Sequence, residues 1–418
     1  MLLLYILFVL IGVGLGIITG LMPGLHVNNV AAIILCIYAS FHTNPLLLAN
    51  LIVANMITHT FVDFIPSTFL GAPNEDTSLS VLPMHRLLLQ GDGFKAIYIS
   101  TYGSLLATIF ALPLIPLFQI ALVNMNLAKY LYFYTPLLLL LIILGLLYME
   151  SKKNLKSMLL SILVITISGT FGYIALHFPL NHNYVIFGKG MSILFPIFTG
   201  LFGIPVLLLS QNTIVPKQRI VKPKIERKHY ISSLVGTLSG SLVGFLPGVT
   251  SGVAAAISRI FIKEDDTEDF LYALGSVNTA NYIFNLTALF LILRPRSAAV
   301  NIITQMLNIP VWFNTKFPPS SFLLILLTVA IASLLSFFIT ILLGKWFAKG
   351  IGKIGKRYGL ISRILIIILF AIIFIFTGII GVAFGIVATL IGLLPPKLGI
   401  MRVHLMSVII IPVLIAYL

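Results

Sequence analysis

Long runs of apolar residues follow one another along this chain, and short polar or basic stretches separate them. A run of roughly 20 apolar residues is long enough for a helix to cross the hydrocarbon layer of a membrane. Besides two hairpins described below, such runs lie at residues 45–70, 93–123, 130–149, 157–179, 191–210, 270–292, 320–343, 364–394 and 398–418. The pattern predicts an all-α polytopic membrane protein with about 10 to 12 membrane segments.

Two of the apolar stretches repeat one unusual pattern. They read LIGVGLGIITGLMPGLHVNNVAA at residues 10–32 and LVGTLSGSLVGFLPGVTSGVAAA at residues 234–256. The identical positions are Leu10/Leu234, Gly12/Gly236, Gly16/Gly240, Gly20/Gly244, Pro23/Pro247, Gly24/Gly248, Ala31/Ala255 and Ala32/Ala256. Glycines four residues apart lie on one helix face, where a second backbone can approach closely. We therefore expect each copy to pack its glycine face against another helix.

Pro-Gly ends the glycine run in each copy. Proline removes a backbone donor and glycine accepts a positive φ, so the helix should stop there. Helical chain is expected to resume near Asn28 and near Ser251. The two copies thus predict broken, re-entrant hairpins at residues 2–42 and 230–262.

Composition supports a membrane protein. The 418 residues are 59% hydrophobic and 9% charged, with a mean hydropathy of +1.11, whereas about a quarter of the residues of a soluble domain are charged. The net charge of +15 comes from basic residues in short loops. Nucleic-acid binding would call for aromatic residues among them, so the positive-inside rule explains them better. Binding of phosphate or anionic lipid by these loops stays an alternative. The single cysteine excludes an intramolecular disulfide and a cysteine metal cluster.

The chain divides into two halves at its most polar loop, the basic linker 211–229. The first repeat comprises residues 1–210, with spans over about 45–210, and the second comprises 230–418, with spans over about 270–418. Five crossings separate the hairpins, and five is odd. The hairpins should therefore enter from opposite membrane faces, as an inverted-topology repeat. The basic linker is predicted to be cytoplasmic and the N-terminus extracytoplasmic.

Polar residues follow both breaks, where a new helix begins. They are His26, Asn28, Asn29, Thr250 and Ser251. Helix N-termini and freed N–H groups can hold an anion, and freed carbonyls can hold a cation. These residues, together with Pro23, Gly24, Pro247 and Gly248, are candidate substrate or ion contacts; simple helix capping is the alternative.

The span after each hairpin is unusually polar. Its candidate site residues are Asn55, Thr58, His59 and Asp63 in the first half and Asn278, Asn281 and Asn285 in the second. A carboxylate inside a membrane is costly, which makes Asp63 a functional candidate. With His59 one helical turn away, we expect a proton or Na⁺ site near Asp63 or the breaks. An interfacial position for Asp63 is the alternative.

Two arginines, Arg294 and Arg296, lie around a proline after the span 270–292. The planar guanidinium suits carboxylate and phosphate, so both arginines are candidate anion ligands. Anchoring at the membrane interface is the alternative for both.

The hairpins, together with LGAPNEDTSLSVLPMHRLLLQGDGFKAI at residues 70–97, resemble the large permease subunit of tripartite tricarboxylate transporters (TctA-like), especially archaeal single-protein relatives. The matching positions are Gly71, Pro73, Pro83, Met84, Gly91 and Ala96. The resemblance implies a solute carrier for a small carboxylate, with Na⁺ or H⁺ as the coupling ion and a homodimer as the assembly. Characterised relatives use a small membrane subunit and an extracytoplasmic binding protein, which this chain does not encode.

The second copy, FLPGVTSGVAAAIS, is also similar to the Pro-Gly motif of polyprenyl-phosphate translocases. Translocation of that lipid carrier is thus the alternative function, and both substrates are anions. A membrane enzyme is disfavoured because His-Glu-x-x-His and Gly-x-Ser-x-Gly motifs are absent from the sequence. A structural or accessory membrane protein would leave the duplicated breaks unexplained. We expect a secondary transporter that works by alternating access, and no enzyme.

Overall fold

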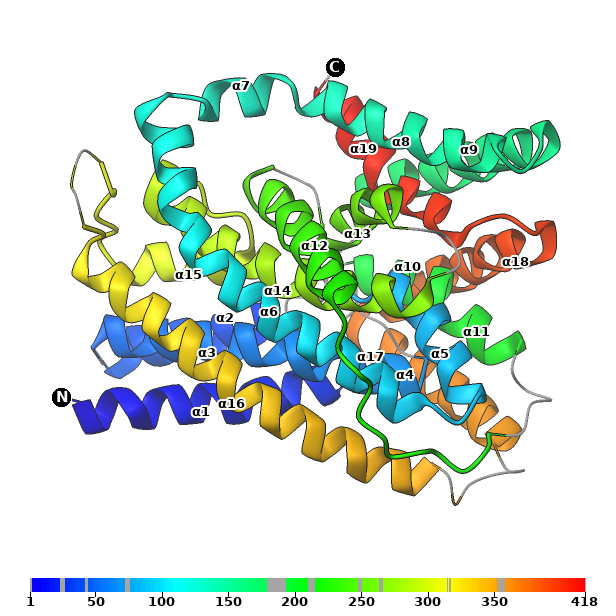
Figure 1. The fold of residues 1–418 in the computed structure, drawn as a ribbon, viewed down its shortest axis with the longest axis horizontal. Helices are drawn as coiled ribbons and strands as arrows, with labels where there is room; N and C mark the ends of the chain where they lie inside the picture. The colour runs from blue at the N-terminus through cyan, green and yellow to red at the C-terminus, as the bar shows by residue number, and fades with distance from the viewer. Residues whose placement is uncertain are drawn as a thin grey trace.

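A computed structural model describes residues 2–22, 27–41, 44–71, 76–178, 193–209, 215–246, 250–262, 266–313, 315, 317–351, 353 and 358–417. All regular elements in these ranges are helical (Figure 1). Six of the described helical segments are long and apolar enough to cross a membrane: 2–21, 45–69, 93–124, 155–177, 320–351 and 377–398. The predicted all-α membrane protein is confirmed.

The first half contains α1 (Leu2–Leu21), α2 (Val27–Phe41), α3 (Pro45–Val62), α4 (Phe64–Phe69), α5 (Val81–Leu89), α6 (Gly93–Gln119), α7 (Ala128–Phe133), α8 (Thr135–Ser151), α9 (Leu155–His177), α10 (Leu194–Phe198) and α11 (Ile204–Leu209). The second half contains α12 (Arg227–Phe245), α13 (Ser251–Phe261), α14 (Thr267–Ile292), α15 (Ala298–Met306), α16 (Ser320–Ile351), α17 (Tyr358–Gly392), α18 (Leu394–Leu398) and α19 (Ser407–Tyr417). Single helical turns are η1 (Ser78–Ser80), η2 (Ile120–Asn124), η4 (Thr199–Gly203) and η6 (Arg402–Met406).

Most predicted runs coincide with these helices to within a few residues, and three features differ. The helices α5 and α15, of nine residues each, were not predicted. The run 364–394 bends inside α17, where Gly378 has φ 67° and ψ −165°. Glycine alone occupies that region without strain, so the kink lies where the sequence permits it.

The glycine faces pack as their spacing predicts. In α1, a Cβ added to Gly16 would lie 2.5 Å from the Cβ of Thr58 in α3. In α12, a Cβ added to Gly240 would lie 2.6 Å from the carbonyl oxygen of Val277 in α14. Gly14, which lies off this face, has nothing within 4 Å. The absence of side chains therefore lets α1 approach α3, and α12 approach α14, to backbone contact.

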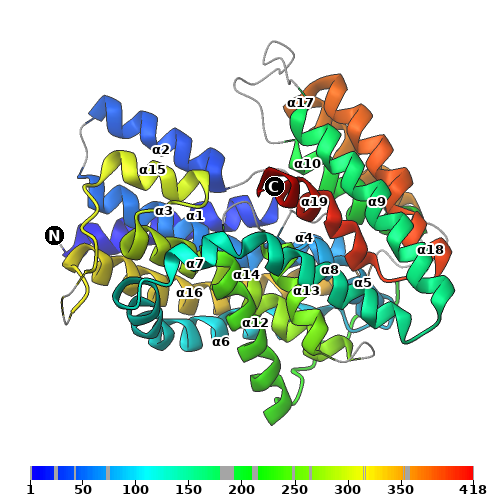
Figure 2. The same cartoon turned by 90° about the horizontal axis from the view of Figure 1, so that it is seen from above.

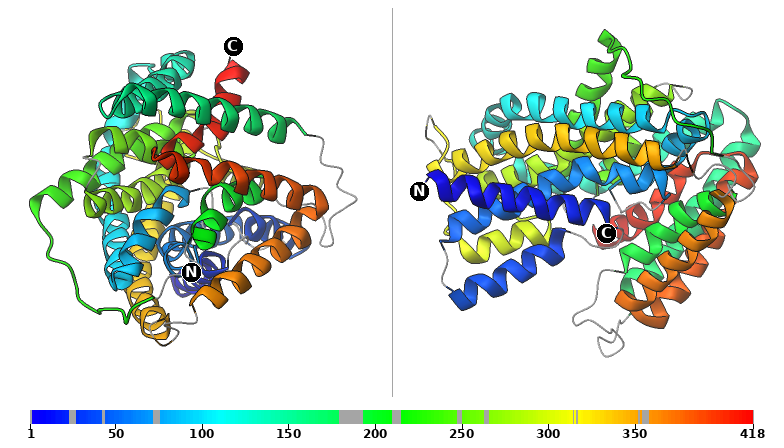
Figure 3. Two further views of the ribbon diagram at one scale, coloured as in Figure 1. Left: turned by 90° about the vertical axis from the view of Figure 1, so that its right-hand side faces the viewer. Right: turned by 90° about the horizontal axis from the view of Figure 1, so that it is seen from below.

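Each half contributes one long helix that packs on the other half. The α16 helix of the second half runs in the same direction as α3, because Asn50 bonds Thr328 and Thr58 bonds Ser336 further along both helices. Figure 3 shows α16, in yellow to orange, lying alongside α1 in blue. This exchange interlocks the halves in one bundle.

The α6 helix of the first half repeats this arrangement on α14. Lys95 pairs with Glu268 near the start of both helices, and the Phe118 and Phe284 rings lie 4.8 Å apart further along. The two helices thus run in the same direction. Against α16, however, α6 runs in the opposite direction, since Thr108 bonds Ser333 while Gly344 contacts Ile97.

The centre of the bundle is α14, whose residues are buried almost all round. Its first half packs with α8, α9, α13 and α19 in one apolar core, and its second half packs with α1, α3, α15 and α16 in another. A helix that is buried on nearly every side lies inside the protein, and its polar side chains must find partners there. Figure 2 shows the two groups of helices on either side of this region, with α9, α17, α18 and α19 together at one side.

Candidate functional site

The helix breaks lie where the sequence predicts them. Helix resumes at Val27 after the first break and at Ser251 after the second. The candidates Pro23, Gly24, His26, Pro247 and Gly248 lie outside the described residues, and so does the side chain of Asn29. The site is therefore built from the residues that flank the breaks.

Two of the flanking side chains, those of Asn28 and Ser251, bond to other helices. Asn28 accepts a hydrogen bond through Oδ1 from the backbone N–H of Ala299, at 3.0 Å. Ser251 accepts one from Nδ2 of Asn281, at 2.7 Å. Thr250 is the N-cap residue of α13 but makes no capping bond, and its hydroxyl has no partner among the described residues. The bonds of Asn28 and Ser251 therefore tie the ends of both breaks to α15 and α14.

One face of α14 carries the three candidate asparagines, spaced three and four residues apart. Asn278 donates to Oδ2 of Asp63 at 3.1 Å, and Asn281 reaches Ser251. Asn285 accepts a bond from the backbone N–H of Arg296 at 3.0 Å. This amide face thus joins the first-half carboxylate, the end of the second-half break and the segment before α15.

Asp63 lies at the junction between α3 and α4 and is buried within the protein, with an exposed fraction of 3%. The helix is interrupted there because Pro66 cannot donate to the carbonyl of Val62. His59 lies one turn earlier, with its Nε2 4.0 Å from Oδ2 of Asp63. The pair forms a buried ionisable unit, as the sequence predicts.

The remaining candidates on α3 connect this unit to its neighbours. Thr19 of α1 donates to Oδ1 of Asn55 at 3.1 Å and lies 3.1 Å from Nδ1 of His59. Thr58 accepts a bond from Ser336 of α16 at 2.8 Å. The polar residues of α3 therefore lie in a hydrogen-bonded row between α1, α14 and α16.

The two arginines have different surroundings. Arg296 is half-buried and donates from Nη1 to the carbonyl of Val243, which lies near the C-terminal end of α12 before the second break. Three residues later, Ala299 binds Asn28 after the first break. Arg294 is exposed. The segment from Arg296 to Ala299, which leads into α15, therefore contacts both hairpins.

That segment is positioned by a turn at Leu293, which has φ 52° and ψ 34°. A non-glycine residue in this left-handed region ends a helix and redirects the chain. The turn places the backbone of Arg296 against Asn285.

Sequence reasoning missed three residues of this region: Asp76, its partner Tyr282, and Thr19. Asp76 is buried and accepts a bond from the hydroxyl of Tyr282 at 3.1 Å. Asp76 lies in a loop rather than in an apolar run, so hydropathy gave no reason to select it. Thr19 lies between Gly16 and Gly20, and the glycine pattern drew attention away from it. Its position beside the glycines that pack against another helix could have identified it as a buried polar residue.

Oxygen atoms dominate the region, which suits a hard cation such as Na⁺ or a proton. Besides the Asp63 carboxylate, Oδ1 of Asn278 is buried and has no hydrogen-bond partner among the described residues. No group of three or more histidine, cysteine, aspartate or glutamate ligands occurs within the described ranges. Any cation here would thus be held by one carboxylate together with amide, hydroxyl or carbonyl oxygens.

Comparison with known proteins decides the family. Residues 6–407 match the model of the tripartite tricarboxylate transporter TctA family. The chain belongs to the TctA family. It is also 30% identical, over 357 residues, to Uncharacterized protein MJ1079 of Methanocaldococcus jannaschii, covering 84% of this chain and 83% of that protein. No solved structure matches the chain significantly.

TctA membership confirms the resemblance seen in the hairpins and in residues 70–97. It makes this chain a multi-pass membrane protein of a transporter family, with a small anion as the class of substrate.

Proposed function

We propose that this TctA protein carries a small di- or tricarboxylate across the membrane by alternating access, driven by a Na⁺ or H⁺ gradient. Asp63, with His59 beside it, would take the cation. The substrate anion would lie between the two breaks. Arg296 and the start of α13 would supply positive charge and N–H donors there.

One observation carries this proposal: a single hydrogen-bonded face of α14 joins the cation candidate to the second broken hairpin. Asn278 contacts Asp63, and three residues later Asn281 contacts Ser251. A change in the charge of Asp63 would be felt at the second hairpin within one helical turn. Coupled transport requires such a connection between ion and substrate sites.

The directions of the helices support an inverted repeat. Helix α1 runs with α3, α3 with α16, and α16 against α6, while α6 runs with α14 and α14 with α12. By these contacts the two glycine-faced helices point in opposite directions. In a membrane, hairpins of this kind would face the substrate from opposite sides, which is the usual basis of alternating access in secondary transporters.

The test is uptake by purified protein in liposomes. A panel of labelled di- and tricarboxylates is offered with an inward Na⁺ gradient, an inward H⁺ gradient, or neither. We expect one gradient to drive accumulation of at least one acid. Asp63→Asn should abolish the dependence on the gradient, because the amide keeps an acceptor for Asn278 and loses only the charge.

Asp92→Asn is the matched control. Asp92 forms an exposed ion pair with Arg219, so this variant removes a carboxylate far from the breaks and should transport normally. If no acid on the panel is taken up and the same liposomes flip polyprenyl phosphate, the lipid-carrier function replaces our proposal. If uptake by Asp63→Asn depends on the cation gradient as uptake by the unaltered protein does, Asp63 is not the cation ligand of the proposed transporter.

A further inference from the structure

A cavity of about 280 Å³ beside η6 is lined by an excess of positive charge. Its basic side chains come from four separate elements: Arg86 of α5, Lys153 after α8, Arg259 of α13 and Arg402 of η6. Ser78 and Thr267 add hydroxyl groups, and no acidic side chain is among the described residues that line it. The composition of this lining suits an anion.

Arg402 is the residue that makes the cavity more than a basic surface. It is only 9% exposed, and its Nε and Nη1 have no hydrogen-bond partner among the described residues. Burying a guanidinium without an acceptor is unfavourable. The natural acceptor is an oxyanion that enters the cavity.

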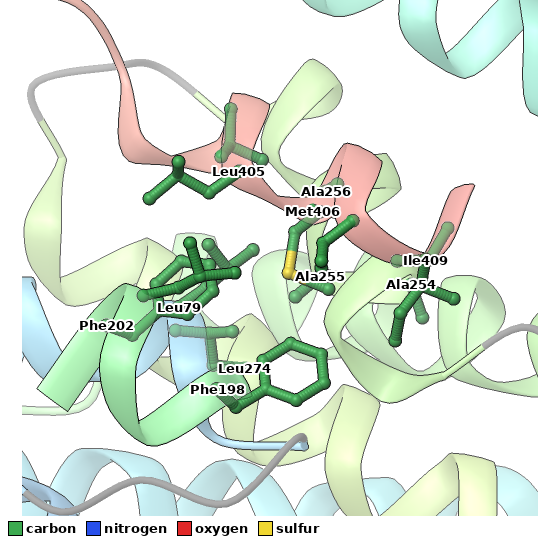
Figure 4. Packing of buried hydrophobic residues seen from close by; sticks show 14 of the residues in the cluster. Leu79, Phe198, Phe202, Ala254, Ala255, Ala256, Leu274, Leu405, Met406 and Ile409 are labelled. Carbon is green, nitrogen blue, oxygen red and sulfur yellow. The ribbon is translucent and has the colours of Figure 1, made fainter. Parts of the chain in front are cut away.

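The backbone around Arg402 is held in place by the neighbouring helices. The N–H of Met401 donates to Glu150 at 2.7 Å, Ser168 donates to the carbonyl of Leu405 at 2.9 Å, and Ser407 donates to the carbonyl of Ile165 at 3.1 Å. Below η6, Leu405 and Met406 point toward the apolar cluster of Leu79, Phe198 and Ala255 (Figure 4). The guanidinium is therefore presented on a rigid support.

The nearest buried acid is already engaged. Oε1 of Glu150 accepts from Met401 and lies 3.4 Å from Nε2 of His404, and Oε2 lies 3.3 Å from Nζ of Lys153. Glu150 thus offsets the charge of Lys153. Among the described residues, no acidic side chain forms an ion pair with Arg402.

The basic residues are graded in depth. Arg86 and Lys153 are exposed at the mouth, and Arg259 is half-buried with its guanidinium 4.6 Å from the centre of the Phe270 ring. Burial, and then the charge of Arg402, lowers the pKa of His85 to about 4, so this neighbouring imidazole is neutral at physiological pH. The positive charge at the cavity therefore comes from its arginine and lysine side chains.

We propose that this cavity binds a compact oxyanion with more than one negative charge, a phosphate or a small polycarboxylate, in contact with Arg402. Three guanidinium groups offer the forked donors that match such oxygens. Pockets for drug-sized ligands measure about 300–1,000 Å³, so this cavity suits a smaller group. The ligand is either a free anion or the phosphate of a lipid headgroup. The inference does not depend on the proposed transport function.

The test uses the full-length protein and two sources of ligand. Binding of inorganic phosphate and of citrate is measured by calorimetry in a zwitterionic detergent, and bound anionic lipid is measured by mass spectrometry of protein from nanodiscs that contain it. The variants are Arg402→Gln and, in case that one does not fold, Arg86→Gln at the exposed mouth. Lys397→Gln is the matched control, since Lys397 is an exposed cation of α18 that does not line the cavity.

We expect tight binding of at least one of the three probes. Each cavity variant should weaken it about tenfold or more, as loss of a charge-assisted bond does, and Lys397→Gln should retain it. Loss confined to phosphate and citrate identifies a free anion, and loss confined to lipid identifies a headgroup. The proposal is overturned if no probe binds, or if Arg402→Gln and Arg86→Gln bind all three as the control does.

Discussion

Helices α3 and α14 take equivalent places in the two halves, yet they carry different chemistry. Gly16 contacts Thr58 where Gly240 contacts Ala280, and Gly20 contacts Val62 where Gly244 contacts Phe284. The residues that follow on the two helices are then equivalent as well. His59 corresponds to Asn281, and Asp63 corresponds to Asn285.

The packing is therefore shared by the halves, and the charge is not. The first half presents an imidazole and a carboxylate, and the second half presents two neutral amides. The two helices also contact different parts of their hairpins: His59 lies against Thr19 before the first break, and Asn281 bonds Ser251 after the second. The glycine-faced helices thus pack alike in the two halves, and the ionisable pair belongs to α3 alone of these two helices. Under the proposed function, the first half would bind the cation and the second half would not.

The largest effect should come from removing the amide that binds the carboxylate. Asn278→Leu removes one hydrogen-bond donor from the buried carboxylate of Asp63, and we expect a loss of about 3–5 kcal/mol in the free energy of unfolding. Asn285→Leu leaves only a neutral N–H of Arg296 without an acceptor, and should cost about 1–3 kcal/mol. Chemical unfolding in detergent, followed by circular dichroism, measures both.

The double variant Asp63→Asn with Asn278→Leu serves as the control for this difference. If charge causes the larger loss, neutralising Asp63 should recover part of it. Equal losses in the two single variants would mean that the halves differ in sequence but not in energetics.

A smaller effect should appear in the shared packing. Gly16→Ala and Gly240→Ala each place a Cβ within 2.6 Å of the facing helix, so each should lose about 1–3 kcal/mol of stability by overpacking. Gly14→Ala is the control, because a Cβ there meets nothing within 4 Å. Thermal unfolding compares the three. A loss in one half and none in the other would show that the two halves do not pack alike.

The sequence predicted the positions of the helices better than the side-chain contacts between them. Hydrophobic runs located α3, α6, α14 and α16, and glycine spacing identified the faces that pack, because burial repeats along a helix with its period. Short α5 and α15 escaped notice, since nine residues leave little periodic signal. Asp76 lies between apolar runs, so hydropathy carries no sign of its burial.

The candidate site shows the same division. Polar residues inside apolar helices stood out, and of these candidates Asp63, His59, Asn55, Asn278 and Asn285 are buried while Asn281 is partly buried. Which of them bond one another depends on how α3, α13 and α14 cross, and spacing along one helix does not encode that. Asp76 and Tyr282 meet across more than 200 residues of chain. The cationic cavity likewise draws on four distant segments.

The smallest expected effect tests whether residues of the second half influence the cation dependence of uptake. A double-mutant cycle of Ser251→Ala and Asn281→Ala should give a coupling energy of about 0.5–1.5 kcal/mol in unfolding, as expected for a neutral hydrogen bond. The equivalent cycle in the first half uses Thr19→Val and His59→Gln. We expect the first-half variants to change the cation dependence of uptake, and the second-half variants to change the apparent affinity for the anion without that shift. Should Asn281→Ala alter the cation dependence as strongly as His59→Gln does, both halves would take part in coupling, and the charge asymmetry between α3 and α14 would have lost its functional meaning.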